Sequence, residues 1–107
     1  MKKIIYNRNN VKDYKEFYES IVVKLNADRF IDWEGEQNLD YNGNNLNEFL
    51  WYCHKDNIQF VFKNFNLDKI ENYKNYENYQ WNIIFTIIKM FVKKFPNNTL
   101  EFINDEN

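Results

Sequence analysis

The sequence is poor in glycine and proline, which form tight turns, in cysteine, which forms disulfides, and in histidine, a common catalytic residue. Its 107 residues include two glycines, one proline, one cysteine and one histidine. Scarce glycine and proline disfavour an all-β protein with many tight turns. A single cysteine excludes an internal disulfide and favours a reducing compartment. No apolar run approaches the roughly 20 residues that cross a membrane, and the N-terminus has no signal-peptide pattern. We therefore expect a cytoplasmic protein without a membrane partner.

The length and the charge narrow the class of protein. A chain of this length is expected to form one domain, 1–107, which can bury roughly 60 to 68 % of its unfolded surface. Aromatic residues make up 20 % of the chain and supply large side chains for that core. Asparagine occurs twenty times, which we attribute to compositional bias. The net charge of −2 disfavours a nucleic-acid partner, because domains that bind nucleic acid are usually basic.

The inventory of reactive residues disfavours an enzyme. Cys53 and His54 are adjacent, so on a helix they point about 100° apart and do not form a nucleophile with its base. One cysteine and one histidine do not make a zinc site. The glycines, Gly35 and Gly43, do not form a phosphate-binding loop. Paired carboxylates are available for acid–base chemistry, but no apolar pocket is evident around them. We expect no catalytic residue, no cofactor and no metal, with Cys53 in the core and His54 on a partly exposed flank.

Residue periodicity predicts a small α/β domain with elements in the order β-α-α-β-α-β. Strands separated by helices imply right-handed crossovers and a three-stranded parallel sheet. We expect Asp13 and Asn45 to cap the first two helices, each with a glutamate three residues later. A tail, 104–107, is expected to fray. The expected strands are 2–6, 58–62 and 100–103, and the expected helices are 14–25, 45–55 and 79–95.

Two segments lack a clear period. Residues 64–78 are predicted to be irregular, although Tyr73, Tyr76 and Tyr79 recur every three residues. Residues 26–44 are predicted to form a long loop, and its part 28–40 carries five carboxylates against one arginine, with aromatic residues between them. One interpretation is a solvated loop whose aromatic side chains enter the core. The other is an acidic, aromatic surface that complements a basic protein site, such as a nuclease that binds phosphates through lysine and arginine.

Trp51 is the second indication of a binding surface. At about 100° per residue it lies about 150° from the apolar face of the helix 45–55. An exposed tryptophan is unusual unless something covers it. Either the long loop or the segment 73–79 covers Trp51, or the side chain is an interface anchor.

The segment from Tyr41 resembles the barstar family of ribonuclease inhibitors. The family pattern is two aromatic residues, then Gly-x-Asn-Leu opening a short helix. Tyr41, Gly43, Asn45 and Leu46 match it, and Asn42 stands in place of the second aromatic residue. The resemblance implies a three-stranded parallel sheet packed by about three helices. It also implies an inhibitor that occupies the active site of another enzyme, and no catalytic activity of its own.

The sequence departs from the family pattern where the family contacts its nuclease. Asn47 stands where the first inhibitory aspartate is usual, and Trp51 stands where the second is expected. The resemblance therefore does not extend to the family's usual nuclease. It favours an immunity protein that blocks a ribonuclease-type toxin, with acidic residues of the long loop in place of the missing carboxylates. The alternative is a non-inhibitory interaction or regulatory module that uses the tyrosines of 73–79. The expected toxin-binding residues are Asp32, Trp33, Glu34, Glu36, Asp40, Tyr41, Asn44, Asn47, Glu48 and Trp51.

Overall fold

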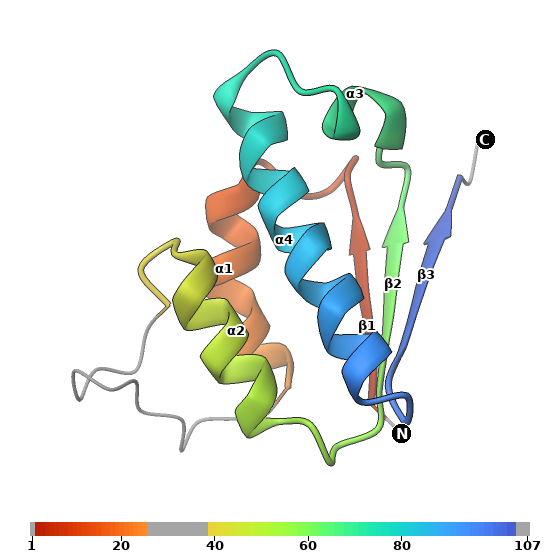
Figure 1. Cartoon of the computed structure of the whole chain (residues 1–107). Helices are drawn as coiled ribbons and strands as arrows, with labels where there is room; N and C mark the ends of the chain where they lie inside the picture. The colour runs from red at the N-terminus through yellow and green to blue at the C-terminus, as the bar shows by residue number, and fades with distance from the viewer. Residues whose placement is uncertain (1, 26–38, 105–107) are drawn as a thin grey trace.

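The described part of the chain is a small α/β domain with a three-stranded parallel sheet (Figure 1). The structure, a computed structural model, describes residues 2–25 and 39–104. Both strand pairs are parallel, in the order β1-β2-β3, which confirms the predicted sheet. The predicted order β-α-α-β-α-β lacks one helix, because two helices lie between β2 and β3. The elements of the described residues are β1 (Lys2–Asn7), α1 (Tyr14–Lys24), α2 (Gly43–Tyr52), β2 (Ile58–Lys63), α3 (Leu67–Glu71), α4 (Tyr76–Lys94) and β3 (Thr99–Ile103).

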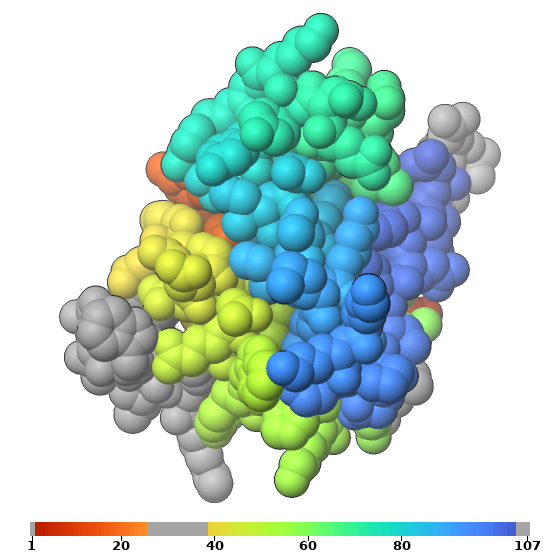
Figure 2. Space-filling view, viewed as in Figure 1, coloured from red at the N-terminus to blue at the C-terminus, as the bar shows by residue number. Residues whose placement is uncertain are grey.

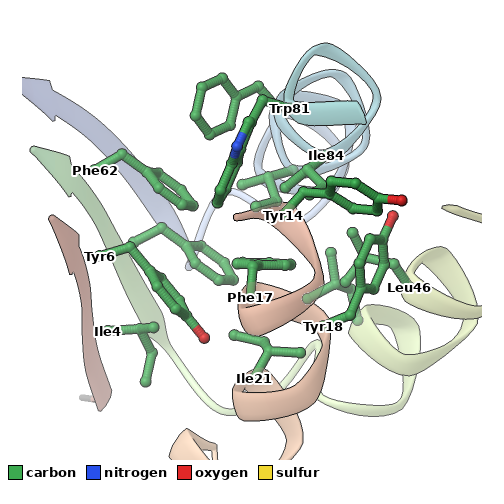
Figure 3. Close-up of a cluster of buried hydrophobic side chains, with 14 of the residues drawn as sticks. Ile4, Tyr6, Tyr14, Phe17, Tyr18, Ile21, Leu46, Phe62, Trp81 and Ile84 are labelled. Carbon is green, nitrogen blue, oxygen red and sulfur yellow. The ribbon is translucent and has the colours of Figure 1, made fainter. Parts of the chain in front are cut away.

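The helices pack on one face of the sheet. Alternation along β1 places Ile4 and Tyr6 in the core, whereas Lys3 and Ile5 on the opposite face are exposed. Figure 3 shows Ile4, Tyr6 and Phe62 directed from the strands toward α1 and α4. None of the helices in the described residues is long and apolar enough to cross a membrane.

Aromatic side chains make up the centre of the core. Trp81 of α4 lies edge-on to Phe17 of α1 (Figure 3), at 5.9 Å between ring centroids. The Trp81 ring also lies 4.8 Å from the ring of Phe65. Phe62 of β2 lies 4.8 Å from Phe85 of α4. Such edge-on pairs add about 0.5–1.5 kcal/mol each beyond the area that they bury.

The start of α1 was predicted correctly and the start of α2 was not. The Asp13 carboxylate accepts a bond from the Glu16 backbone N–H at 3.2 Å, as expected of an N-cap. In α2 the cap is Asn42, whose side-chain oxygen accepts from the N–H groups of Asn44 and Asn45. Asn45 instead lies inside the helix, which begins two residues earlier than predicted and ends three residues earlier, at Tyr52.

The prediction of an irregular segment over 64–78 was wrong in part, and the number of helices is four. Asn66 caps α3 by accepting from the Lys69 N–H at 3.0 Å, and Asn75 caps α4 by accepting from the Asn78 N–H at 2.8 Å. These asparagines start helices because their short side chains satisfy N–H groups that have no partner within the helix. A composition that was attributed to bias therefore contains structural signals.

Candidate functional site

The structure places six of the ten predicted toxin-binding residues. Most of the predicted loop 26–44 lies outside the described residues, and so do four of its site residues, Asp32, Trp33, Glu34 and Glu36. The placed residues lie on α2 and on the turn before it: Asp40, Tyr41, Asn44, Asn47, Glu48 and Trp51.

The outer face of α2 presents four of these side chains together. Asn44, Asn47, Glu48 and Trp51 follow one another at i, i+3, i+4 and i+7, which places them on one side of a helix. Three of them are exposed and Glu48 is half-buried, while the opposite side, including Leu46, is buried in the core. We call these four residues the α2 face. It is rich in amide and aromatic groups and carries one carboxylate, so its own charge is small.

A close approach of α2 to α4 sets the position of this face. A Cβ atom added to Gly43 would lie 2.9 Å from Ile83 Cγ2 and 2.9 Å from Ile87 Cδ1, both on α4. Glycine allows the two helices to lie side by side at this point, as Figure 2 shows for the yellow-green and blue surfaces. The glycine of the Tyr-x-Gly-x-Asn-Leu segment therefore has a packing role here.

Trp51 is exposed at the far end of the α2 face. The side chain keeps 44 % of its surface open, and its ring lies edge-on to Phe95 at 5.0 Å between centroids. Lys94 places its Nζ atom 4.4 Å from the centre of the indole. Both contacts come from the C-terminal end of α4, whereas the segment 73–79 lies at its N-terminal end, so that segment does not cover Trp51. The lysine also makes this end of the face positive.

Tyr41 is held in an uncommon backbone conformation. Asp40 and Tyr41 both have positive φ, 50° and 52°, and the Asn42 N–H donates to the Leu39 carbonyl at 3.0 Å. This is the pattern of a turn with two left-handed central residues, which glycine and asparagine usually occupy. A bulky residue adopts it only where the surrounding contacts fix it.

Those contacts come from α1. The Tyr41 ring lies edge-on to Tyr14 at 6.4 Å and to Tyr18 at 6.2 Å, and its hydroxyl donates to Glu19 Oε1 at 3.2 Å. The bond to Glu19 raises the pKa of Tyr41, and the charges of Glu19, Asp13 and Asp40 act in the same direction. The negative charge of the described site is therefore gathered near the start of α1 and the turn before α2.

This contribution of α1 could not be predicted from the sequence. Asp13 was assigned only to the helix cap, and Glu19 was not assigned to any site. The available signal was weak, because acidic residues at intervals of three along a helix are common on solvated faces. Only the packing of Tyr41 onto α1 brings these carboxylates beside the predicted binding residues.

Cys53 and His54, the chain's single cysteine and histidine, lie at the C-terminal end of α2. Cys53 is buried, as predicted, and burial is the main reason that the pKa of its thiol rises from 9.0 to about 12. His54 is partly exposed, as predicted, and its Nδ1 lies 2.7 Å from the Trp51 carbonyl oxygen at the end of α2. Within residues 2–25 and 39–104, no group of three or more His, Cys, Asp or Glu side chains is placed to hold a metal ion.

Comparisons of the chain with protein-family models, with curated proteins and with solved structures each found no match.

Proposed function

We propose that this chain is a barstar-like immunity protein that binds and blocks a ribonuclease-type toxin. The α2 face would enter or cover the cleft of the toxin and exclude its RNA substrate. The observation that carries the proposal is Trp51, a large side chain that stays 44 % exposed on the outer face of a short helix. Exposed tryptophans are favoured anchors of protein interfaces, and a few such residues supply most of the binding energy.

The electrostatic part of the proposal rests on the turn before α2. Asp40 and Glu19 lie near Tyr41 and offer negative charge to a cleft that grips phosphates. Lys94 opposes the binding of a basic cleft at the other end of the face, because it places a positive charge over the Trp51 ring. We therefore expect the basic groups of the toxin to meet the Tyr41 end of the face, and its apolar groups to meet the Trp51 end.

The test begins with co-expression and co-purification with the product of the adjacent gene. With that product in hand, we expect Trp51→Ala to weaken binding by about 2 kcal/mol or more, roughly 30-fold in Kd. Val23→Ala is the matched control, because Val23 is an exposed apolar residue on α1. The association rate is expected to fall as salt is added. Equal binding by the parent and Trp51→Ala would show that the α2 face is not the interface. An association rate that does not change with salt would refute the electrostatic part of the proposal.

A second candidate function is a non-inhibitory interaction module. The exposed rings of Tyr73, Tyr76 and Tyr79 favour it, because they lie away from the α2 face and near the start of α4. A toxin-like reading frame beside the gene favours the first candidate, and its absence favours the second.

A further inference from the structure

Tyrosine side chains from three parts of the chain form one continuous surface. Four rings are exposed by 38 to 64 %. Tyr79 lies 5.0 Å from Tyr73 and 6.0 Å from Tyr76 between ring centroids, and Tyr14 joins Tyr76 at 5.9 Å to Tyr41 at 6.4 Å. We call these five residues the tyrosine surface. Single exposed aromatic residues are ordinary, but a connected group of them marks a site of interaction.

Carboxylates surround the tyrosine surface. Glu19 accepts a hydrogen bond from the Tyr41 hydroxyl, and Glu77 Oε2 accepts one from the Tyr14 backbone N–H at 2.7 Å. Asp13 and Asp40 are close enough for their charges to act on the Tyr41 hydroxyl. A cation of the chain already uses one ring, since Lys15 Nζ lies 5.6 Å from the centre of Tyr41. Ring faces and carboxylates both attract cations, so the surface is complementary to a positively charged side chain.

A buried hydroxyl beneath this surface has no partner. Tyr18 is 3 % exposed, and no described residue gives its hydroxyl a hydrogen bond. Its ring contacts Tyr14 at 6.4 Å and Tyr41 at 6.2 Å. Figure 3 shows the Tyr18 and Tyr14 hydroxyls on the side of α1 that faces away from the sheet. Buried polar groups are nearly always paired in folded proteins, so this hydroxyl is free to accept a hydrogen bond from a donor that approaches the tyrosine surface.

We propose that the tyrosine surface binds an arginine side chain of a partner protein, which stacks between the exposed rings and donates a hydrogen bond to the Tyr18 hydroxyl. Arginine fits better than lysine, because its planar guanidinium stacks on aromatic faces and carries five donors that pair with carboxylates. The acidic surroundings repel nucleic acid and also repel the same surface of a second copy. The proposal does not rest on the inhibition of a nuclease.

A peptide titration of the full chain tests the proposal without any toxin. The probe is a capped nine-residue peptide with three arginines separated by glycine and serine, and the comparison peptide has lysine at the same positions. Binding is followed through backbone amide shifts in two-dimensional NMR. We expect the shifts to centre on residues 13–19, 40–41 and 73–79. We expect the arginine peptide to bind about threefold tighter or more than the lysine peptide.

Three variants complete the experiment. The double variant Tyr76→Ala with Tyr79→Ala is expected to lose about tenfold in affinity, since two ring faces are removed. Tyr18→Phe is expected to lose about threefold or more while folding at least as stably as the parent, because it deletes only the orphan hydroxyl. Tyr52→Ala, an exposed tyrosine at the far end of α2, is the control and is expected to bind like the parent.

Several outcomes would overturn the proposal. Shifts spread over all acidic residues would show attraction by net charge alone. Equal binding of the two peptides would exclude a preference for arginine. If Tyr18→Phe binds the arginine peptide like the parent, the buried hydroxyl takes no part in binding. Trp51→Ala is tested with the toxin, and the peptide titration tests the tyrosine surface without any toxin, so the failure of either proposal can be told from the failure of the other.

Discussion

Replacing Asn98 by alanine is expected to destabilise the domain far more than its size suggests. Asn98 is a buried polar residue, 2 % exposed, just after α4. Its Oδ1 accepts the Ile58 backbone N–H at 2.8 Å, and its Nδ2 donates to the carbonyl oxygens of His54 and Phe95, both at 3.1 Å. One side chain thus joins the end of α4 to the start of β2 and to the segment that follows α2.

The partners lose different amounts when the amide is removed. The His54 carbonyl keeps a bond from Asn97 Nδ2 at 3.0 Å, and the Phe95 carbonyl keeps one from the Asn98 backbone N–H at 2.9 Å. The Ile58 N–H is fully buried and loses the acceptor named above. An unsatisfied buried donor costs about 1–3 kcal/mol, and the two weakened carbonyl contacts add about 1 kcal/mol together. We therefore expect Asn98→Ala to lower the free energy of unfolding by about 2–4 kcal/mol.

Urea denaturation followed by circular dichroism measures this loss. Asn97→Ala is the matched control, because Asn97 is exposed and its bonds compete with water, so we expect a loss below about 1 kcal/mol. Asn98→Asp keeps the acceptor for Ile58 but buries a charge beside two carbonyl oxygens, so at pH 7 it is expected to cost more than Asn98→Ala. Equal losses for Asn97→Ala and Asn98→Ala would refute the assignment of the cost to the buried N–H of Ile58.

Two further predictions concern Gly43 and Cys53. Gly43→Ala is expected to lower the free energy of unfolding by about 0.5–2 kcal/mol, because overpacking against Ile83 and Ile87 exceeds the gain in helix propensity. In urea denaturation, the second substitution Ile87→Val should partly restore the stability. Unchanged stability of Gly43→Ala alone would contradict the close approach of the two helices. Because the pKa of the Cys53 thiol is raised to about 12, the thiol is almost entirely protonated at pH 8, and alkylation by iodoacetamide is expected to be at least about a hundredfold slower in the folded than in the urea-unfolded protein. Equal alkylation rates in the two states would contradict the raised pKa. The raised pKa also stabilises the fold below pH 9.0, and this contribution is lost as the pH rises toward 12.

The strands and the long helix could be predicted from the sequence because their periodicity is local. The part 60–62 of β2 is continuously apolar, as a central parallel strand is, and the structure places β2 between β1 and β3. Helix starts were less certain. In the run from Asn42 to Asn47 several asparagines could act as a cap, and the choice of Asn42 depends on the left-handed turn at Asp40 and Tyr41. That turn is fixed by contacts with α1, which no local pattern contains.

The candidate site divides in the same way. Helical geometry predicted that Trp51 points away from the apolar face of its helix, and the structure places it on the outer face of α2, together with Asn44, which had been predicted to lie in the preceding loop. The position of Lys94 over Trp51 could not be predicted, because the two residues are 43 positions apart and meet only through the packing of α4.

The sequence by itself determined the class of fold, the parallel sheet and the outward direction of Trp51, since these depend on the alternation and spacing of apolar side chains along a single segment. The tertiary structure alone decided which charges lie beside which rings. Glu19 meets Tyr41, Lys94 meets Trp51, and the Tyr18 hydroxyl is left without a described partner, because distant segments share one core. Side chains far apart in the chain come together only when the burial of apolar surface fixes how the helices lie against the sheet.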